Sequence, residues 1–365
     1  MTKSTLILSP TSINPTLKNF RVRGVFNPAA VRLKDNKILL FARIAETPLH
    51  GEKYFLAPRF VGNKELKIIV ETLPRKKGKF QSLDNYFIFD SEKARLPTIS
   101  HFRKILLDET GTKVLSISQK PDFFGLKDDG DFGVEDPRIT FLKDEKKFVM
   151  TYVSVSMCSG VSTSLATSHN LETWKRHGII FRQQNKDVVI LPEKINGYYV
   201  ALHRPEGTMI FDKPRIWISF SKDLIFWGKE RPIMGPRKKG WDSLRIGSGT
   251  VPIRIKEGWL EIYHGVKLVR KKGEEYKVYS AGAVVFDKKM KKIIARSPEN
   301  KPLFTPKQAF EKTGFVSNVV FPTSALQGSS DDLLVFGGAS DSCLFVRKLS
   351  IKKILESLVW EVSNI

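Results

Sequence analysis

The chain has 365 residues, of which 41% are hydrophobic and 27% are charged, as in a typical soluble globular protein. No apolar run approaches the roughly 20 residues of a membrane span, and the run from Leu6 to Leu8 is too short for a secretory signal, so we expect a cytoplasmic protein with no membrane partner. A formal net charge of +23 would suit a nucleic-acid binder, but the lysines are scattered in pairs and no nucleic-acid motif is present, which predicts a solvated basic surface without a specific nucleic-acid partner.

Short apolar segments alternate with Gly, Pro, Asn and Asp along most of the chain and predict β-strands, whereas helical periodicity is convincing only from about Ile351 to Val359. The strands recur as similar hairpins, and the third copy contains Asn196 and Gly197, the residues of a tight turn. The five copies are NPAAVRLKDNKILLF from Asn27, DPRITFLKDEKKFVMTY from Asp136, KDVVILPEKINGYYVALHR from Lys186, TVPIRIKEGWLEIYHG from Thr250 and NVVFPTSALQGSSDDLLVFGGASD from Asn318.

The spacing of these hairpins suits four-stranded blades, and the long first interval indicates an insertion within about 45–130. A second repeat, SHNLETW from Ser168 and SKDLIFW from Ser221, supports the count. We therefore predict an all-β protein, a five-bladed β-propeller forming one domain over residues 1–365, with a short C-terminal helix and a closing segment at about 349–365. Polar residues at the starts of inner strands and at hairpin ends should converge on the axis: Asn27, Arg43, Asp136, Lys186, Asp187, His203, Arg204, Arg245, His264 and Asp341.

The segment GVEDPRIT, residues 133–140, contains two adjacent carboxylates at the entrance of an apolar strand. Pro137 fixes its own φ and should push Asp136 into an extended conformation. Arg138 is near enough to influence which carboxylate stays ionised. In isolation this pattern would be read as a turn with a surface ion pair, but the rest of the chain favours a site. Glu135 has two open interpretations, orienting Arg138 or binding a sugar hydroxyl.

The motifs together resemble those of glycoside hydrolase family 130, the β-mannoside phosphorylases and related mannosidases. The resemblance runs from about Phe26 to Asp341, and members of that family are five-bladed propellers, in agreement with the repeat count. Two parts depart from the family pattern: the last motif reads FGGASDS, and the segment 45–130 has no recognisable counterpart. The motifs that carry the resemblance are FNPA (26–29), GVEDPRIT (133–140), NKDVVILPEKINGYYVALHRP (185–205), WDSLRIGSGTVP (241–252), GWLEIYHGV (258–266) and FGGASD (336–341).

The resemblance implies one catalytic carboxylate, Asp136, which protonates the glycosidic oxygen through the 3-hydroxyl of the mannosyl unit. Phosphate attacks the anomeric carbon with inversion, and the product is α-mannose 1-phosphate. The phosphate-binding residues implied are Lys186, Arg204, Arg245 and His264. The predicted sugar-binding residues are Asn27, Arg43, Glu135, Asp187 and Asp341.

This chemistry fits the residue types. An inverting hydrolase needs an acid and a separate base that activates water, whereas phosphate is already an anionic nucleophile and needs cations to hold it. Arginine binds two phosphate oxygens at once and lysine acts as a point charge; His264 is a further candidate cation. We expect inorganic phosphate as co-substrate, a β-mannoside oligosaccharide as partner, and no metal or organic cofactor. Glu193 would be the base in a hydrolytic alternative, although a role in a turn is favoured.

Three alternatives remain at this stage. The first two are a β-mannosidase and a mannose 1-phosphate-dependent β-mannosyltransferase of the same fold. The third is a non-catalytic propeller that binds glycans or polyanions, against which the presence of Asp136 and the phosphate-binding cations argues. The linkage (β-1,2 or β-1,4), the acceptor and assembly into a homo-oligomer are left open. Cys158 and Cys343 are expected to be buried free thiols.

Overall fold

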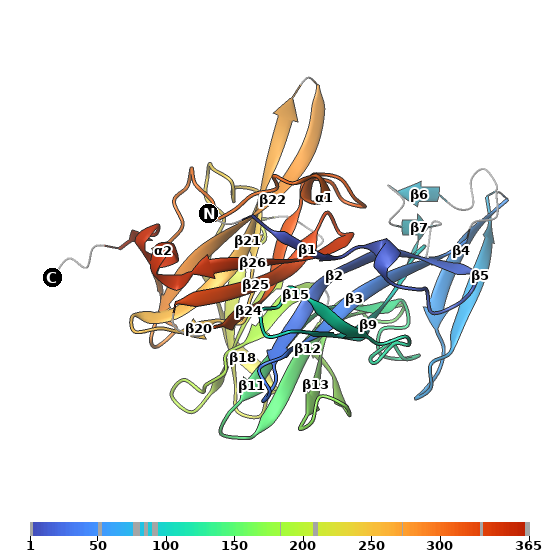
Figure 1. Ribbon diagram of the computed structural model, residues 1–365, viewed down its shortest axis with the longest axis horizontal. Helices are drawn as coiled ribbons and strands as arrows, with labels where there is room; N and C mark the ends of the chain where they lie inside the picture. Colours follow the sequence, from blue (N-terminus) through green and yellow to red (C-terminus); the bar gives the residue numbers. More distant parts are fainter. Residues whose placement is uncertain are drawn as a thin grey trace.

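The alternating segments of the sequence form short antiparallel strands, gathered into five sheets around a common axis (Figure 1). The computed structural model describes residues 3–49, 53–75, 81–83, 87–89, 94–182, 184–206, 211–271, 273–328 and 331–361. The five-bladed propeller predicted from the repeats is confirmed, and each of the five predicted hairpins lies in a different blade.

Each blade is a sheet of four main strands. The first blade contains β2 (Phe20–Arg32), β3 (Ile38–Pro48), β9 (Ile99–Leu107) and β10 (Val114–Ile117). The second contains β11 (Gly133–Leu142), β12 (Lys147–Ser156), β13 (Gly160–Ser168) and β14 (Lys175–Phe181). The third contains β15 (Asn185–Ile190), β16 (Tyr199–Pro205), β17 (Ile216–Ser221) and β18 (Trp227–Met234).

The last two blades are completed by the chain ends. The fourth contains β19 (Arg245–Gly247), β21 (Gly258–Lys271), β22 (Glu274–Asp287) and β23 (Ile293–Arg296), with β20 (Ile253–Arg254) beside β21 and β27 (Val359–Trp360) beside β23. The fifth contains β24 (Val320–Gln327), β25 (Asp332–Ala339), β26 (Cys343–Ser350) and the N-terminal β1 (Thr5–Leu8).

The ring closes where β1 pairs with β26, strands from opposite ends of the sequence (Figure 1). Buried polar contacts fix this closure: Ser4 Oγ donates to Glu311 Oε1 at 2.6 Å and Arg347 Nε donates to Ser4 Oγ at 3.1 Å. The C-terminal helix α2 (Ile351–Glu356) is shorter than predicted, because the chain turns at Ser357 and then adds β27 to the fourth blade. The predicted closing segment therefore links the last two blades, and its residues 362–365 lie outside the described part.

The insertion in the first blade is smaller than the expected 45–130. Strands β9 and β10 are ordinary outer strands of the blade, and the added strands lie between β3 and β9. Parts of the expected insertion, residues 50–52, 76–80, 84–86 and 90–93, lie outside the described residues. The added strands are the hairpin β4 (Tyr54–Phe60) with β5 (Ile68–Pro74), and a small sheet of β6 (Gln81–Leu83), β7 (Phe87–Phe89) and β8 (Ala94–Arg95).

The second sequence repeat is explained by two equivalent turns. Ser168 Oγ accepts a hydrogen bond from the Leu171 amide, and Ser221 Oγ accepts one from the Leu224 amide, both at 2.9 Å. Both leucines have positive φ, 63° and 71°, and are buried. The repeated Ser and Leu thus hold the turn between the third and fourth strands of two successive blades.

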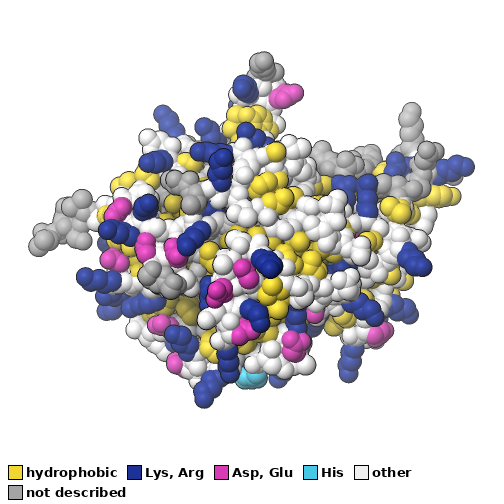
Figure 2. All heavy atoms as spheres, in the orientation of Figure 1, with side chains coloured by type: hydrophobic (Ala, Val, Ile, Leu, Met, Phe, Trp, Pro, Cys, Tyr) yellow, Lys and Arg dark blue, Asp and Glu magenta, His cyan; other side chains and the backbone are white. Residues whose placement is uncertain are grey.

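The two faces of the ring differ in what they carry. We call the face at which β11 and β15 begin the site face, and the face bearing the turn between the first two strands of each blade the opposite face. Because strands alternate in direction, the β3–β9 connection and the tip of the long β21–β22 hairpin lie on the site face (Figure 1). Lys and Arg side chains are spread over the visible surface, between areas of other types (Figure 2). Within the described residues, no helix is both long and apolar enough to cross a membrane.

Candidate active site

Three inner strands bulge at equivalent places near the axis. The pairing register shifts after Phe26 in β2, after Glu135 in β11 and after Lys186 in β15. The first residues of the three bulges are Asn27, Asp136 and Asp187, and their φ angles are 46°, 50° and 57°, respectively. Asn and Asp tolerate this left-handed conformation better than other side chains do, and a bulge re-aims the side chain that it carries. The extended conformation predicted for Asp136 is therefore wrong, because the bulge overrides the preference set by Pro137.

Arg43 brings the two adjacent carboxylates together. It lies on β3 opposite Phe26, whose ring centroid is 4.7 Å from the guanidinium carbon. Its Nη1 donates to Asp136 Oδ1 at 3.0 Å and its Nη2 to Glu135 Oε1 at 2.6 Å. Its Nε donates to Ser100 Oγ at 3.1 Å, a partner that sequence reasoning missed. Of the two interpretations of Glu135, orientation of Arg138 is wrong, since the arginine that it binds is Arg43.

The two oxygens of Asp136 have different surroundings. Oδ1 accepts hydrogen bonds from Arg43 and from Asn27 Nδ2, the latter at 2.9 Å. Among the described residues no side chain donates to Oδ2, and the Asp136 side chain is 16% exposed. Oδ2 is thus the oxygen of Asp136 that is available to a bound molecule.

Asp341 adds a third carboxyl group to this cluster. It has a φ of 47° and follows β25. Burial raises the pKa of Asp341 to about 7, with Arg43 opposing and Asp136 reinforcing the shift. Burial also raises the pKa of Glu135 in spite of Arg43. Glu135 and Asp341 therefore retain protons closer to neutral pH than isolated carboxyl groups would.

Glycines make room for two of the polar side chains. A Cβ atom on Gly338 would lie 2.0 Å from Asn27 Oδ1, and one on Gly247 would lie 2.3 Å from Asp187 Oδ2. Both distances are far below van der Waals contact. Gly338, the second glycine of FGGASD, and Gly247 of LRIG are therefore required by the close approach of Asn27 and Asp187.

A basic cluster lies on the neighbouring blades. Lys186 and Arg204 face each other across the β15–β16 pair. Arg204 Nε donates to Asp187 Oδ2 at 2.7 Å, and Arg204 Nη1 donates to Glu206 Oε1, which also lies 3.6 Å from Arg245 Nη1. Burial, reinforced by Arg204, lowers the pKa of Lys186, and the Lys186 ammonium interacts electrostatically with Glu135 and Asp136. The basic cluster therefore borders the carboxyl cluster.

His264 is not a cation at neutral pH. Burial lowers the pKa of His264 to about 3, because Asp187, whose oxygen lies 3.6 Å from Nε2, does not offset the desolvation and the nearby arginines. The expectation that His264 supplies a positive charge is wrong, although the neutral ring still has one N–H to donate. Burial opposes ionisation of Asp187, but Arg204, Arg138 and Lys186 together hold the pKa of Asp187 well below its usual value.

Arg138 and Glu261 stabilise the bulge at Asp136 through contacts with main-chain groups. Arg138 Nη1 donates to the carbonyl oxygens of Asp136 (3.1 Å) and Pro137 (3.2 Å), and its Nε donates to that of Gly249 at 2.7 Å. The Gly249 amide in turn donates to Glu261 Oε1 at 3.1 Å. Arg138 thus holds main-chain carbonyls, and its charge also interacts with Asp136. Its influence on which carboxylate stays ionised remains a prediction, while Arg43 makes the direct contacts to both carboxylates.

Two further candidates lie elsewhere. His203 is buried inside the third blade, between Asn185 Nδ2 (2.9 Å) and Ser219 Oγ (2.8 Å), and it stacks on Phe181. Burial lowers its pKa to about 4. Glu193 is exposed in the turn between β15 and β16, at the opposite end of β15 from Asp187. Glu193 is therefore a turn residue, as favoured from the sequence.

Comparison with known proteins agrees with this geometry. Residues 111–359 match the family model described as β-1,4-mannooligosaccharide phosphorylase, the model of glycoside hydrolase family 130. The chain is also 33% identical over 358 residues to β-1,2-mannobiose phosphorylase of Listeria innocua, with 96% of each chain covered. The chain belongs to glycoside hydrolase family 130.

A solved structure and two further relatives agree with this assignment. A solved structure of the Listeria innocua β-1,2-mannobiose phosphorylase in complex with β-1,2-mannobiose superposes with a TM-score of 0.85, at 30% identity and 96% coverage of both chains. A 1,2-β-oligomannan phosphorylase of Thermoanaerobacter is 37% identical over 61% of this chain and 70% of its own. A β-1,4-mannooligosaccharide phosphorylase of Ruminococcus albus is 31% identical over 60% of this chain and 64% of its own.

The pH dependence of stability tests whether Glu261 is buried in its protonated form. Burial raises the pKa of Glu261 to about 8, so the folded protein holds its proton more tightly than the unfolded chain does. The contribution of protonated Glu261 to the stability of the folded protein is fully present below pH 4 to 5 and is lost as the pH rises through about 8. We expect the free energy of unfolding of Glu261→Gln, relative to wild type, to increase between pH 5 and pH 9, as measured by denaturant unfolding. An equal pH dependence in both proteins would contradict the buried protonated state.

Proposed function

We propose that the enzyme cleaves a β-1,2-linked mannoside with inorganic phosphate, with inversion, to give α-mannose 1-phosphate. The observation that carries the proposal is the juxtaposition of Asp136, with Oδ2 unbonded among the described residues, and two cations on the next blade, the partly buried Lys186 and the buried Arg204. One group is suited to proton transfer and the other to holding a dianion.

The carboxyl cluster would act on the leaving group. Asn27 and Arg43 fix Asp136 Oδ1, so that Oδ2 transfers a proton to the glycosidic oxygen, through the sugar 3-hydroxyl as the family resemblance implies. Burial raises the pKa of Asp341 to about 7 and also raises that of Glu135, so these two neighbours of Arg43 hold protons more readily than exposed carboxyl groups do.

The basic cluster would hold phosphate for attack on the anomeric carbon. Lys186, Arg204 and Arg245 supply three charges, and Tyr279, whose hydroxyl oxygen accepts from Arg245 Nη2 at 2.5 Å, orients one of them. Since phosphate is already anionic, no second carboxylate is needed as base. The proposed reaction therefore uses phosphate as its co-substrate and neither a metal nor an organic cofactor.

The β-1,2 linkage and the cytoplasmic location are the finer parts of the proposal. Support for the linkage comes from three relatives named as phosphorylases of β-1,2-linked mannosides, one of which matches almost the whole chain, against one relative named for β-1,4-mannooligosaccharides. Both cysteines are free thiols, which suits a reducing compartment; Cys343 is buried as expected, whereas the expectation of burial is wrong for Cys158, which is exposed.

Asp136→Asn tests the acid. The amide oxygen still accepts from Asn27 and Arg43, but the group has no acidic proton, so we expect kcat to fall by about 10²- to 10⁴-fold with unchanged melting temperature. Asp144→Asn, in the exposed turn after β11, is the matched control and should retain full activity. An Asp136→Asn protein that keeps more than about a tenth of the wild-type rate would refute the assignment.

Lys186 and Arg204 test the phosphate site. For Lys186→Ala and for Arg204→Lys, we expect the KM for phosphate to rise about 10-fold or more, because a charge-assisted contact or a two-oxygen grip is lost. The KM for the mannoside should change little, and Lys194→Ala in the same hairpin should behave as wild type. Release of free mannose at a rate indifferent to phosphate would instead indicate a hydrolase.

A further inference from the structure

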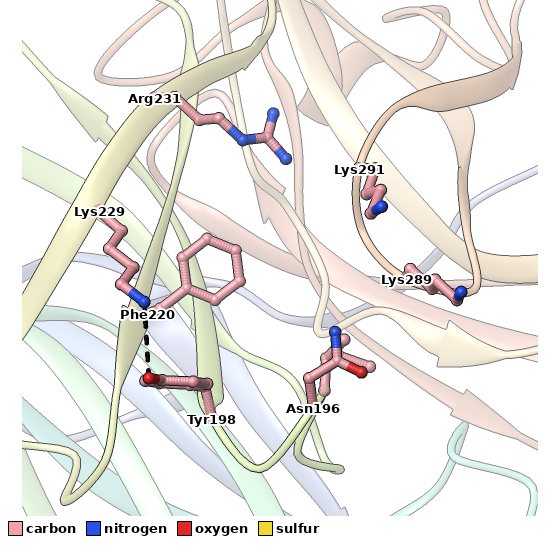
Figure 3. A pocket seen from close by; sticks show the side chains of 8 residues that line it. Asn196, Tyr198, Phe220, Lys229, Arg231, Lys289 and Lys291 are labelled. Atoms are coloured by element: carbon pink, nitrogen blue, oxygen red, sulfur yellow. Dashed lines mark hydrogen bonds between the residues drawn. The ribbon is translucent and has the colours of Figure 1, made fainter.

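A second basic site lies away from the candidate active site. It is a pocket of about 490 Å³ between the third and fourth blades (Figure 3). We call it the basic pocket; its lining residues are Ile195, Asn196, Tyr198, Phe220, Lys229, Arg231, Lys289 and Lys291. They come from the β15–β16 turn, β17, β18 and the β22–β23 turn, which places the pocket on the opposite face of the ring.

The cations of this pocket form no ion pairs within the described part of the chain. Lys229 and Arg231 approach from β18, and Lys289 and Lys291 come from the β22–β23 turn across the pocket (Figure 3). No carboxylate lines the pocket, and among the described residues none of these four side chains forms an ion pair. The positive charges of two blades therefore add in one concavity, where a bound anion would interact with all of them.

The backbone presents these cations in fixed positions. Arg231 Nη2 donates to the carbonyl of Met290 at 3.0 Å, which ties β18 to the opposing turn. Met290 is fully buried, and Asp287 accepts hydrogen bonds from the amides of Lys289 and Lys291. Lys229 itself occupies a left-handed bulge with a φ of 54°.

Aromatic rings give the pocket an uncharged wall. Phe220 and Tyr198 are arranged edge to face, with ring centroids 6.4 Å apart. Lys229 Nζ lies 4.8 Å from the Tyr198 ring centroid, which positions the ammonium without cancelling its charge. Asn196, at the turn tip, adds an amide group to the rim. The lining thus suits a ligand with one strongly anionic group and a less polar carbon skeleton.

We propose that the basic pocket is a second binding site, for the phosphate ester of a sugar, with the phosphate among Lys229, Arg231, Lys289 and Lys291 and the sugar ring against Phe220. The product of the proposed reaction, mannose 1-phosphate, belongs to this class, so the choice of probe rests on the proposed function. Inorganic phosphate would fill only the cationic part of the pocket.

The test is calorimetric titration of mannose 1-phosphate, inorganic phosphate and mannose into the intact protein. We expect two sites for mannose 1-phosphate in the wild type and one in Lys289→Gln/Lys291→Gln. The control Lys288→Gln/Lys292→Gln removes the same charge from the same turn, but from residues that do not line the pocket, and should keep both sites. Phe220→Leu should weaken the second site for mannose 1-phosphate while leaving inorganic phosphate unaffected, in a protein of unchanged melting temperature.

Each result bears on a different claim. Two sites in Lys289→Gln/Lys291→Gln, or equal loss in both double variants, would overturn the basic pocket as a site. Equal affinity for inorganic phosphate and mannose 1-phosphate, or binding of long polyphosphate alone, would overturn the sugar phosphate as its ligand. Arg204→Ala separates the proposed function: it should remove the other site, and retention of both sites there would contradict the phosphate assignment at the axis while leaving the basic pocket intact.

Discussion

The candidate site depends on the bulges that interrupt three inner strands at Asn27, Asp136 and Asp187. In a regular strand, successive side chains alternate between the two faces of the sheet. A left-handed residue breaks this alternation and redirects one polar side chain, which is why Asn27 of the first blade reaches Asp136 of the second. Such conformations cost about 1 to 2 kcal/mol each for most L-residues, and Asn and Asp keep that cost small. Closure of the ring then brings the three bulges together.

The charges in the site are divided into two adjoining parts. Arg43 is shared by the carboxyl groups of Glu135, Asp136 and Asp341, and burial raises the pKa of Glu135 and of Asp341 against the opposing effect of Arg43. Lys186, Arg204 and Arg245 form the other part, which favours an anion. Arg138 connects the two parts, because its charge interacts with Asp136 of the first and with Asp187 beside the second. Phosphorolysis of a β-mannoside needs the carboxyl groups and the cations in separate places. The leaving oxygen requires a proton donor, whereas the phosphate nucleophile requires positive charges.

The sequence predicted the ring and most of the site because both depend on local patterns. Each blade begins with a hairpin whose alternation and turn residues are visible in a short window, and the motif residues flank those hairpins. The missed features depend on distant segments. Pairing of β1 with β26 joins the two ends of the chain, and the roles of Glu206 and Glu261 follow from neighbours on other strands. The charge of His264 was misjudged because its burial is a property of the assembled ring.

The central claim is that phosphate, rather than water, attacks the anomeric carbon from the face opposite the leaving group. The most direct measurement is time-resolved proton and phosphorus NMR of the wild-type enzyme with β-1,2-mannobiose or β-1,4-mannobiose, with and without phosphate. The account predicts that α-mannose 1-phosphate is the first phosphorylated product, that one free mannose accompanies it, that β-1,2-mannobiose is preferred, and that turnover stops without phosphate. Formation of the β-anomer, or release of mannose alone in the presence of phosphate, would contradict it.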